Sequence, residues 1–170
     1  YHHGSRPGKI EIRATVSCLT PREMRLAYLP GASFPASEIA ADPANLYRYT
    51  ARGNLVALVT NGSAVPGLGD VGPAAAKPML EGMAVILKRL ADLDVFDLEI
   101  AEDDPKALAD TVARLEPTFG AINLKDIRAP QGLMLLDLLT ERLRIPVFHE
   151  NLHGTAVVAA AALVNALDLV

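Results

Sequence analysis

From residue 54 to residue 167 the sequence alternates between short apolar runs and segments with helical spacing, and this alternation restricts the chain to few folds. The apolar runs cover residues 54–60, 95–101, 119–124 and 146–149. Helices are predicted over residues 79–93, 131–143 and 155–167, and a further helix is opened by Asp104-Pro105. Strands that alternate with helices form parallel sheets covered on both faces. We therefore predict an α/β fold, a three-layer α/β/α domain with a mostly parallel sheet of about four strands.

The first 53 residues are less regular than the rest of the chain. Residues 9–15 alternate like an edge strand, residues 21–27 read as a short helix, and residues 30–35 as a turn. We expect residues 1–53 to form an arm that packs on an α/β core of residues 54–170. We expect no dinucleotide-binding domain within these residues.

The composition excludes several classes of protein. The chain is 51% hydrophobic and 21% charged, and no apolar stretch is long enough to span a bilayer. The net charge of -4 argues against a nucleic-acid partner, which would require clustered Lys and Arg. Cys18 is the only cysteine, so there is no internal disulfide, which suits a reducing compartment. We expect a cytoplasmic protein that binds neither nucleic acid nor membrane.

In an open parallel sheet, ligands bind beyond the carboxyl ends of the strands. The segments at those ends are residues 61–72, 125–128 and 149–153. We therefore expect the functional residues to lie in these three segments.

A glycine-rich motif lies in the first of these segments. Residues 67–72 (GLGDVG) fit G-x-G-x-x-G, the pattern of a dinucleotide fingerprint. A true fingerprint lies directly between a strand and a helix, so that the pyrophosphate meets the helix N-terminus. Here six residues follow the strand before the motif, and Pro73 with five further residues precedes the predicted helix. We interpret the motif as a loop in which backbone packs against backbone.

A zinc-like motif lies in the third segment. Residues 149–153 (HENLH) fit H-E-x-x-H, which needs both histidines on one face of a helix. Residues 145–148 lead into the motif as a strand and Gly154 follows it. We therefore predict a strand end and a turn rather than a zinc site.

Several segments together resemble the N-terminal, malate-binding domain of bacterial malic enzymes. They are residues 7–10, 26–31, 49–56, 61–72, 115–120, 122–124, 129–130 and 145–155. The resemblance covers essentially the whole chain in order and spacing. It implies a homodimer and a small organic acid as ligand. Malic enzymes oxidise malate with NAD or NADP and release carbon dioxide to give pyruvate, using Mg²⁺ or Mn²⁺. In that family a dinucleotide-binding domain follows the N-terminal domain that this chain resembles.

The resemblance assigns roles to particular residues. Tyr28 matches the tyrosine acid that protonates the enol, although it also reads as a half-buried core tyrosine. Lys77 matches a lysine of the family's Gly-Lys-Pro segment, and reads equally well as an exposed surface lysine. Asn61, Gly67 and Asp70 complete, with Lys77, the expected substrate-binding set.

The position of the catalytic base departs from the family. Where the family reads Glu-Gly-Lys, this chain reads Glu81-Gly82-Met83. Methionine cannot take a proton, because its thioether is only a weak acceptor. We interpret Met83 as a core residue on one helix face with Met79 and Leu87. Lys88 would face a different side of that helix.

The implied metal positions also depart from the family. Asn-Leu-Glu-Asp has become Asn123-Leu124-Lys125-Asp126, and His-Asp-Asp has become His149-Glu150-Asn151. Asp126 is retained, whereas Lys125 and Asn151 replace carboxylates, and Glu150 is a further candidate ligand. Lys125 brings a positive charge to a cation site, so we expect it to pair with Asp126.

Three hypotheses follow. The first is a degenerate malic-enzyme-like domain that keeps a site for a small acid, for binding, assembly or altered chemistry, without metal-dependent oxidation of malate. The second is a fragment of an active NAD(P)-dependent malic enzyme with misaligned ligands. The third is a dimerisation module. We expect this chain alone to bind no cofactor.

Overall fold

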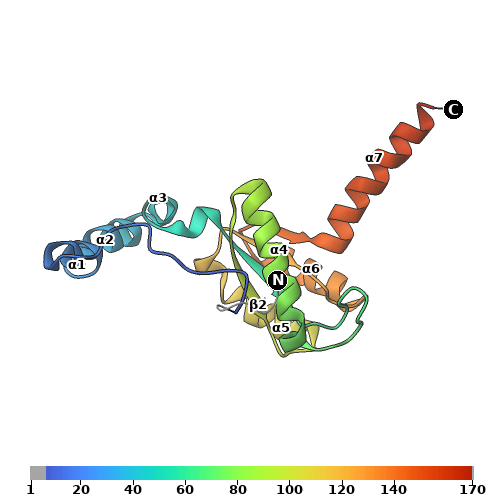
Figure 1. Cartoon of the computed structure of the whole chain (residues 1–170), viewed down its shortest axis with the longest axis horizontal. Helices are drawn as coiled ribbons and strands as arrows, with labels where there is room; N and C mark the ends of the chain where they lie inside the picture. The colour runs from blue at the N-terminus through green and yellow to red at the C-terminus, as the bar shows by residue number, and fades with distance from the viewer. Residues whose placement is uncertain (1–6, 170) are drawn as a thin grey trace. The chain divides into compact units, whose positions relative to one another are not determined.

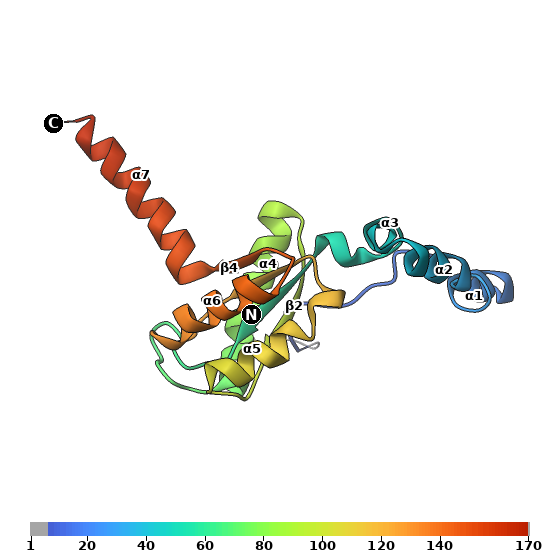
Figure 2. The same cartoon turned by 180° about the vertical axis from the view of Figure 1, so that it is seen from behind.

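The computed structural model describes residues 7–169 (Figures 1 and 2). It divides the chain into two compact units. The smaller unit is Ile10–Gly53, and the larger unit joins residues 7–9 to residues 54–169.

The larger unit is built on a parallel sheet. Its strands are β1 (Leu55–Thr60), β2 (Asp94–Glu99), β3 (Ala121–Leu124) and β4 (Val147–His149). Their order across the sheet is β2-β1-β3-β4, and each neighbouring pair is parallel. All four predicted strands are confirmed, with ends that differ by one or two residues.

Helices cover both faces of this sheet, as can be followed in Figures 1 and 2. They are α4 (Pro73–Ala91), α5 (Pro105–Ala113) and α6 (Gln131–Arg142). On one face, Leu80 of α4 packs against Leu58. On the other, Leu108 of α5 and Leu135 of α6 pack with Val59. Leu58 and Val59 are neighbours whose side chains point to opposite faces of the strand, so β1 is buried from both sides. The predicted three-layer α/β/α architecture is confirmed.

Helix α4 begins six residues before its predicted start at residue 79. Pro73 occupies its first turn, where the missing N–H would be unpaired in any helix. Pro78 lies inside the helix and removes one backbone donor without ending it. The predicted start at residue 79 is therefore wrong. Asp104 caps α5 as predicted, accepting the Ala107 N–H at 2.9 Å.

The last helix, α7 (Thr155–Leu167), matches its predicted range and follows directly after η4 (Glu150–Gly154), a single π-helical turn. None of the residues of α7 is buried. Its large exposed apolar side chains are Val157, Val158, Leu163, Val164 and Leu167. In the part of the chain that the structure describes, no helix combines the length and apolar character that a membrane crossing requires.

The smaller unit contains α1 (Pro21–Ala27), α2 (Ser33–Ala41), η1 (Pro43–Asn45), α3 (Leu46–Tyr49) and most of η2 (Ala51–Asn54). Helix α1 was predicted, and Thr20 and Glu23 form a capping box at its start. Residues 9–15 form no strand and take no part in the four-stranded sheet, so the predicted edge strand is wrong. The turn predicted over residues 30–35 is cut short, since α2 begins at Ser33.

Candidate functional site at the carboxyl ends of the strands

The strand order defines where the site should lie. From β1 the chain passes to β2 on one side of the sheet and then returns to β3 on the other side of β1. The point where the direction reverses is where ligands bind in open α/β sheets. The loops after β1 and β3 meet at this switch point. The Ala64 N–H donates to the Asp126 carbonyl at 3.0 Å, and the Arg128 N–H donates to Ser63 Oγ at 3.0 Å.

The loop after β1 is tied together by Asn61. Its Oδ1 accepts hydrogen bonds from the backbone N–H and the hydroxyl of Ser63, at 3.2 and 2.6 Å. Its Nδ2 donates to the Glu102 carbonyl at 3.2 Å. Both ends of this buried amide are therefore engaged within the protein. Asn61 lies at the switch point as predicted, and its bonds show that it shapes the loop.

The glycine-rich motif lies nearer to a helix than predicted. Because α4 begins at Pro73, Gly72 immediately precedes it. The Val71 and Gly72 N–H groups both donate to the Gly62 carbonyl, at 3.1 and 3.2 Å. The motif still starts six residues beyond the end of β1, and its backbone folds back on Gly62. This arrangement supports a packing loop, although the separation predicted between motif and helix was wrong.

Two other residues of this loop were expected to bind substrate. Gly67 has a positive φ of 76°, and a Cβ built there would meet no heavy atom within 4 Å. Asp70 is exposed and pairs with Arg128 at 3.2 Å between Oδ2 and the guanidinium. The pair links the loop after β1 to the loop after β3.

A buried ion cluster lies beside this switch point. Lys125 Nζ is 2.8 Å from Glu150 Oε1 and 3.7 Å from Asp126 Oδ1. Asp126 is 0% exposed, and neither of its carboxylate oxygens has a hydrogen-bond partner. Burial raises the pKa of Asp126, against the opposing effect of the Lys125 ammonium. The cluster unites three of the predicted residues, and the expected pairing of Lys125 with Asp126 is present as the longer of two ion pairs.

The residues at the implied metal positions do not fit a divalent cation. Asn151 is exposed, and the described residues contain no group of three or more acidic, His or Cys side chains that could hold a metal ion. An ion bound to Asp126 at about 2.1 Å would lie within about 6 Å of the Lys125 ammonium. Two positive charges facing one at that separation repel by about 6 kcal/mol at an effective dielectric constant of 20. The ammonium therefore competes with any divalent ion here.

The zinc-like motif is a strand end followed by a turn, as predicted. His149 is the last residue of β4, and residues 150–154 form η4. The His149 backbone N–H donates to Nδ1 of His153 at 3.0 Å. Burial, and then the nearby His153, lower the pKa of the buried His149 imidazole. The His153 side chain thus accepts a hydrogen bond from the His149 backbone.

The position that the resemblance implies for the base is apolar. Met83 packs, partly buried, against the cluster of Leu58, Val65, Ala76 and Leu80 between α4 and the sheet. The interpretation of Met83 as a packing residue agrees with this environment. Met79 is instead 41% exposed and does not pack in this cluster, so it does not share that buried face.

Lys77 is held by carboxylates of β2. Its Nζ lies 2.6 Å from Asp97 Oδ2 and 3.4 Å from Glu99 Oε2. The hydrogen bond to Asp97 raises the pKa of Lys77, whereas burial and the Asp97 carboxylate raise the pKa of Glu99. Sequence reasoning missed both acids, although Asp97 and Glu99 stand two residues apart and therefore face the same side of the strand.

Tyr28, the expected acid, belongs to the smaller unit. It directly follows α1, and its backbone N–H donates to the Met24 carbonyl at 3.0 Å. Tyr28 is 72% exposed, so the alternative of a half-buried core tyrosine is wrong.

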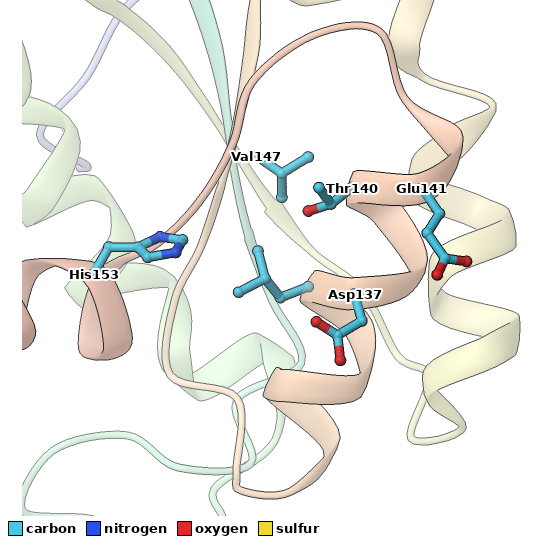
Figure 3. A pocket seen from close by; sticks show the side chains of 6 residues that line it. Asp137, Thr140, Glu141, Val147 and His153 are labelled. Atoms are coloured by element: carbon cyan, nitrogen blue, oxygen red, sulfur yellow. The ribbon is translucent and has the colours of Figure 1, made fainter.

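A hollow of about 480 Å³ lies between α6, the start of β4 and the η4 turn. It is lined by Leu136, Asp137, Thr140, Glu141, Val147 and His153. Figure 3 shows the His153 ring on one side of the hollow, with Asp137 and Thr140 on another. The two carboxylates give the lining a negative charge, which suits a cationic rather than an acidic ligand. Sequence reasoning did not single out these α6 residues.

An α/β domain with loops meeting at the switch point of a four-stranded parallel sheet defines a class of small-ligand domains. Comparison with known proteins narrows this class. The family model described as "Malic enzyme, N-terminal domain" matches residues 7–111. The chain belongs to this family, as the resemblance indicated.

The similar proteins include enzymes specific for either dinucleotide. The chain is 51% identical to the NADP-dependent malic enzyme of Haemophilus influenzae over 170 residues, which are 100% of this chain and 22% of that protein. It is 47% identical to the NAD-dependent malic enzyme of Rhizobium meliloti over 99% of this chain and 22% of that protein. The crystal structure of the malic enzyme from Pyrococcus horikoshii superposes with a TM-score of 0.94 at 46% identity, covering 98% of this chain and 39% of that one. The chain thus spans less than half of these relatives.

Proposed function

We propose that this domain binds a small organic acid. We propose also that, as it stands, it does not support the metal- and NAD(P)-dependent oxidative decarboxylation of malate. The observation that carries the proposal is Met83. The resemblance places it where the family has its lysine base, and its side chain packs against an apolar cluster. A thioether is only a weak acceptor, so nothing at this position takes the hydroxyl proton.

No neighbouring lysine replaces the missing base. A catalytic lysine needs a lowered pKa, so that it is neutral near the working pH. Asp97 and Glu99 instead hold Lys77 in its charged form and raise its pKa. Lys88, on the same helix, is paired with Asp92 and Asp94. Both lysines of α4 are therefore held as cations in ion pairs.

The site retains groups that suit an acid. Arg128 places a half-exposed guanidinium at the switch point, where its present partner is the exposed Asp70. A ligand carboxylate would compete with Asp70 for this guanidinium, because the planar guanidinium group can form two parallel hydrogen bonds to one carboxylate. We propose that the domain binds such an acid as a cytoplasmic homodimer and holds no dinucleotide by itself.

A second function has its own support. The chain is 51% identical, over all 170 residues, to a protein named NADP-dependent malic enzyme, and this supports its being part of an active NAD(P)-dependent malic enzyme. In that case a different lysine, or a different placement of the acid, would supply the proton transfer.

A thermal-shift screen tests the first proposal. Small hydroxy and oxo acids are added to the purified chain, with and without Mg²⁺. At least one acid should raise the unfolding temperature equally in both conditions, and Arg128→Ala should abolish that shift. An acid whose stabilisation requires Mg²⁺ would contradict the proposal.

An activity assay separates the two functions. The product of the longest natural reading frame that contains this chain is assayed for malate-dependent reduction of NAD and NADP with Mn²⁺. We expect no turnover above background. Turnover that is abolished by mutating Tyr28 to Phe would establish the second function instead.

A further inference from the structure

One lysine side chain joins the ends of two neighbouring strands. Lys125 is the first residue after β3, and Glu150 is the first residue after β4. The Lys125 ammonium lies 2.8 Å from Glu150 Oε1 and 3.7 Å from Asp126 Oδ1. A single positive charge therefore stands between carboxylates from two adjacent loops.

This is the task that a divalent cation performs where acidic side chains converge on one point. A metal ion would draw the same two loops together through carboxylate oxygens. Here an amine of the chain itself does so, at one of the positions where the resemblance implies a metal ligand. The residues around it do not fit a divalent ion, since Asn151 is exposed and Lys125 is itself a cation.

Because its partner carboxylates are wholly or partly buried, the Lys125 ammonium is needed to compensate their charge. Asp126 is wholly buried, and Glu150 Oε2 is also a buried oxygen without a hydrogen-bond partner. Removing the cation from such a pair leaves an uncompensated buried charge, which costs far more than the intact pair contributes. The loops after β3 and β4 therefore depend on the ammonium for their arrangement.

We propose that Lys125 is a resident cation that replaces the divalent metal ion and holds this end of the sheet together without one. The proposal goes beyond the function proposed above, because it concerns how the site is assembled and holds whichever acid is bound. It assigns Glu150 and Asp126 as the two carboxylates that the ammonium bridges.

Substitution of Lys125 tests the proposal. Thermal unfolding is measured for the native chain, Lys125→Met and Lys125→Glu, each with EDTA and with Mn²⁺, and free Mn²⁺ is followed by its electron paramagnetic resonance signal. Lys88→Met is the matched control, since Lys88 also bridges two carboxylates, Asp92 and Asp94, but does so at the surface.

The native chain should unfold at the same temperature with EDTA and with Mn²⁺, and should leave the Mn²⁺ signal unchanged. Lys125→Met should unfold about 10 °C lower in both conditions, and Lys88→Met nearly as the native chain does. Lys125→Glu, which adds a third acidic side chain, should be stabilised by Mn²⁺.

Two results would overturn the proposal. The first is Mn²⁺ binding by the native chain with a dissociation constant below about 1 mM that Asp126→Asn abolishes. The second is a Lys125→Met variant no less stable than Lys88→Met. If Lys125→Glu does not fold even with Mn²⁺, the native chain and the Met variant still decide the question. Neither result depends on whether an acid binds or malate is oxidised.

Discussion

Lys77 Nζ lies 2.6 Å from Asp97 Oδ2, and this contact fastens helix α4 to strand β2. The lysine side chain is 48% exposed, whereas the Asp97 side chain is 4% exposed. Such an asymmetric pair is more sensitive to loss of the cation than a surface pair, because the carboxylate remains behind in a buried position.

Lys77→Met should therefore destabilise the chain by about 1–3 kcal/mol, the cost of leaving a buried polar group unsatisfied. Urea unfolding gives the free energy. Lys88→Met is the comparison, because its partners Asp92 and Asp94 are both well exposed. It should cost no more than about 1 kcal/mol. Equal losses in the two variants would show that the burial of Asp97 is unimportant.

The raised pKa of Glu99 predicts how stability should depend on pH. Burial, and then the neighbouring Asp97, raise the pKa of Glu99 in the folded chain. Between the unfolded pKa, near 4.5, and the raised folded pKa, the folded state binds more protons than the unfolded state. The contribution of Glu99 to stability is thus full below pH 4.5 and is lost as the pH rises through the folded pKa.

The Glu99→Gln variant removes this titration. The free energy of unfolding of the variant, minus that of the native chain, should increase as the pH rises from about 4 to 8 and then level off. Chemical unfolding at a series of pH values measures this difference. A difference that stays constant with pH would contradict the raised pKa of Glu99.

The loop after β1 offers a matched pair of glycines. Gly62 and Gly67 both have positive φ, 69° and 76°. A Cβ at Gly62 would lie 2.1 Å from the Gly72 carbonyl oxygen, whereas one at Gly67 would meet nothing within 4 Å. Gly67→Ala should therefore cost only backbone strain, about 1 kcal/mol. Gly62→Ala should cost at least about 1 kcal/mol more. Similar unfolding midpoints would show that the loop moves to admit the methyl group.

The periodic part of the fold was predictable, because burial imposes its own spacing on the sequence. Leu58 and Val59 are consecutive residues that are buried on opposite faces of the sheet. A strand buried on both faces therefore appears in the sequence as a continuous apolar run, and such a run predicts a central parallel strand. The start of α4 was not predictable from that spacing, since Pro78 carries the same local signal whether it breaks a helix or lies within one.

The candidate site was predictable only in part. The sequence places Lys125 beside Asp126, and their pairing followed from opposite charge. The closer partner, Glu150, is 25 residues away and approaches Lys125 only because β3 and β4 are neighbours in the sheet. The acids that hold Lys77 were missed for the same reason, as the β1–β2 pairing and the packing of α4 had to be known first.

Ser63 links the two loops that meet at the switch point, and its substitution is the most direct test of their coupling. The buried hydroxyl donates to Asn61 Oδ1 at 2.6 Å and accepts the Arg128 N–H at 3.0 Å. Ser63→Ala leaves a backbone donor without its acceptor and should cost about 1–3 kcal/mol. Ser37→Ala is the control, because the exposed Ser37 hydroxyl donates to the Ser33 carbonyl within the same helix. This substitution should change the free energy of unfolding by less than about 0.5 kcal/mol. Hydrogen exchange should show faster exchange at Arg128 in Ser63→Ala alone, and unchanged protection there would mean that the loop after β3 is held in place without the loop after β1.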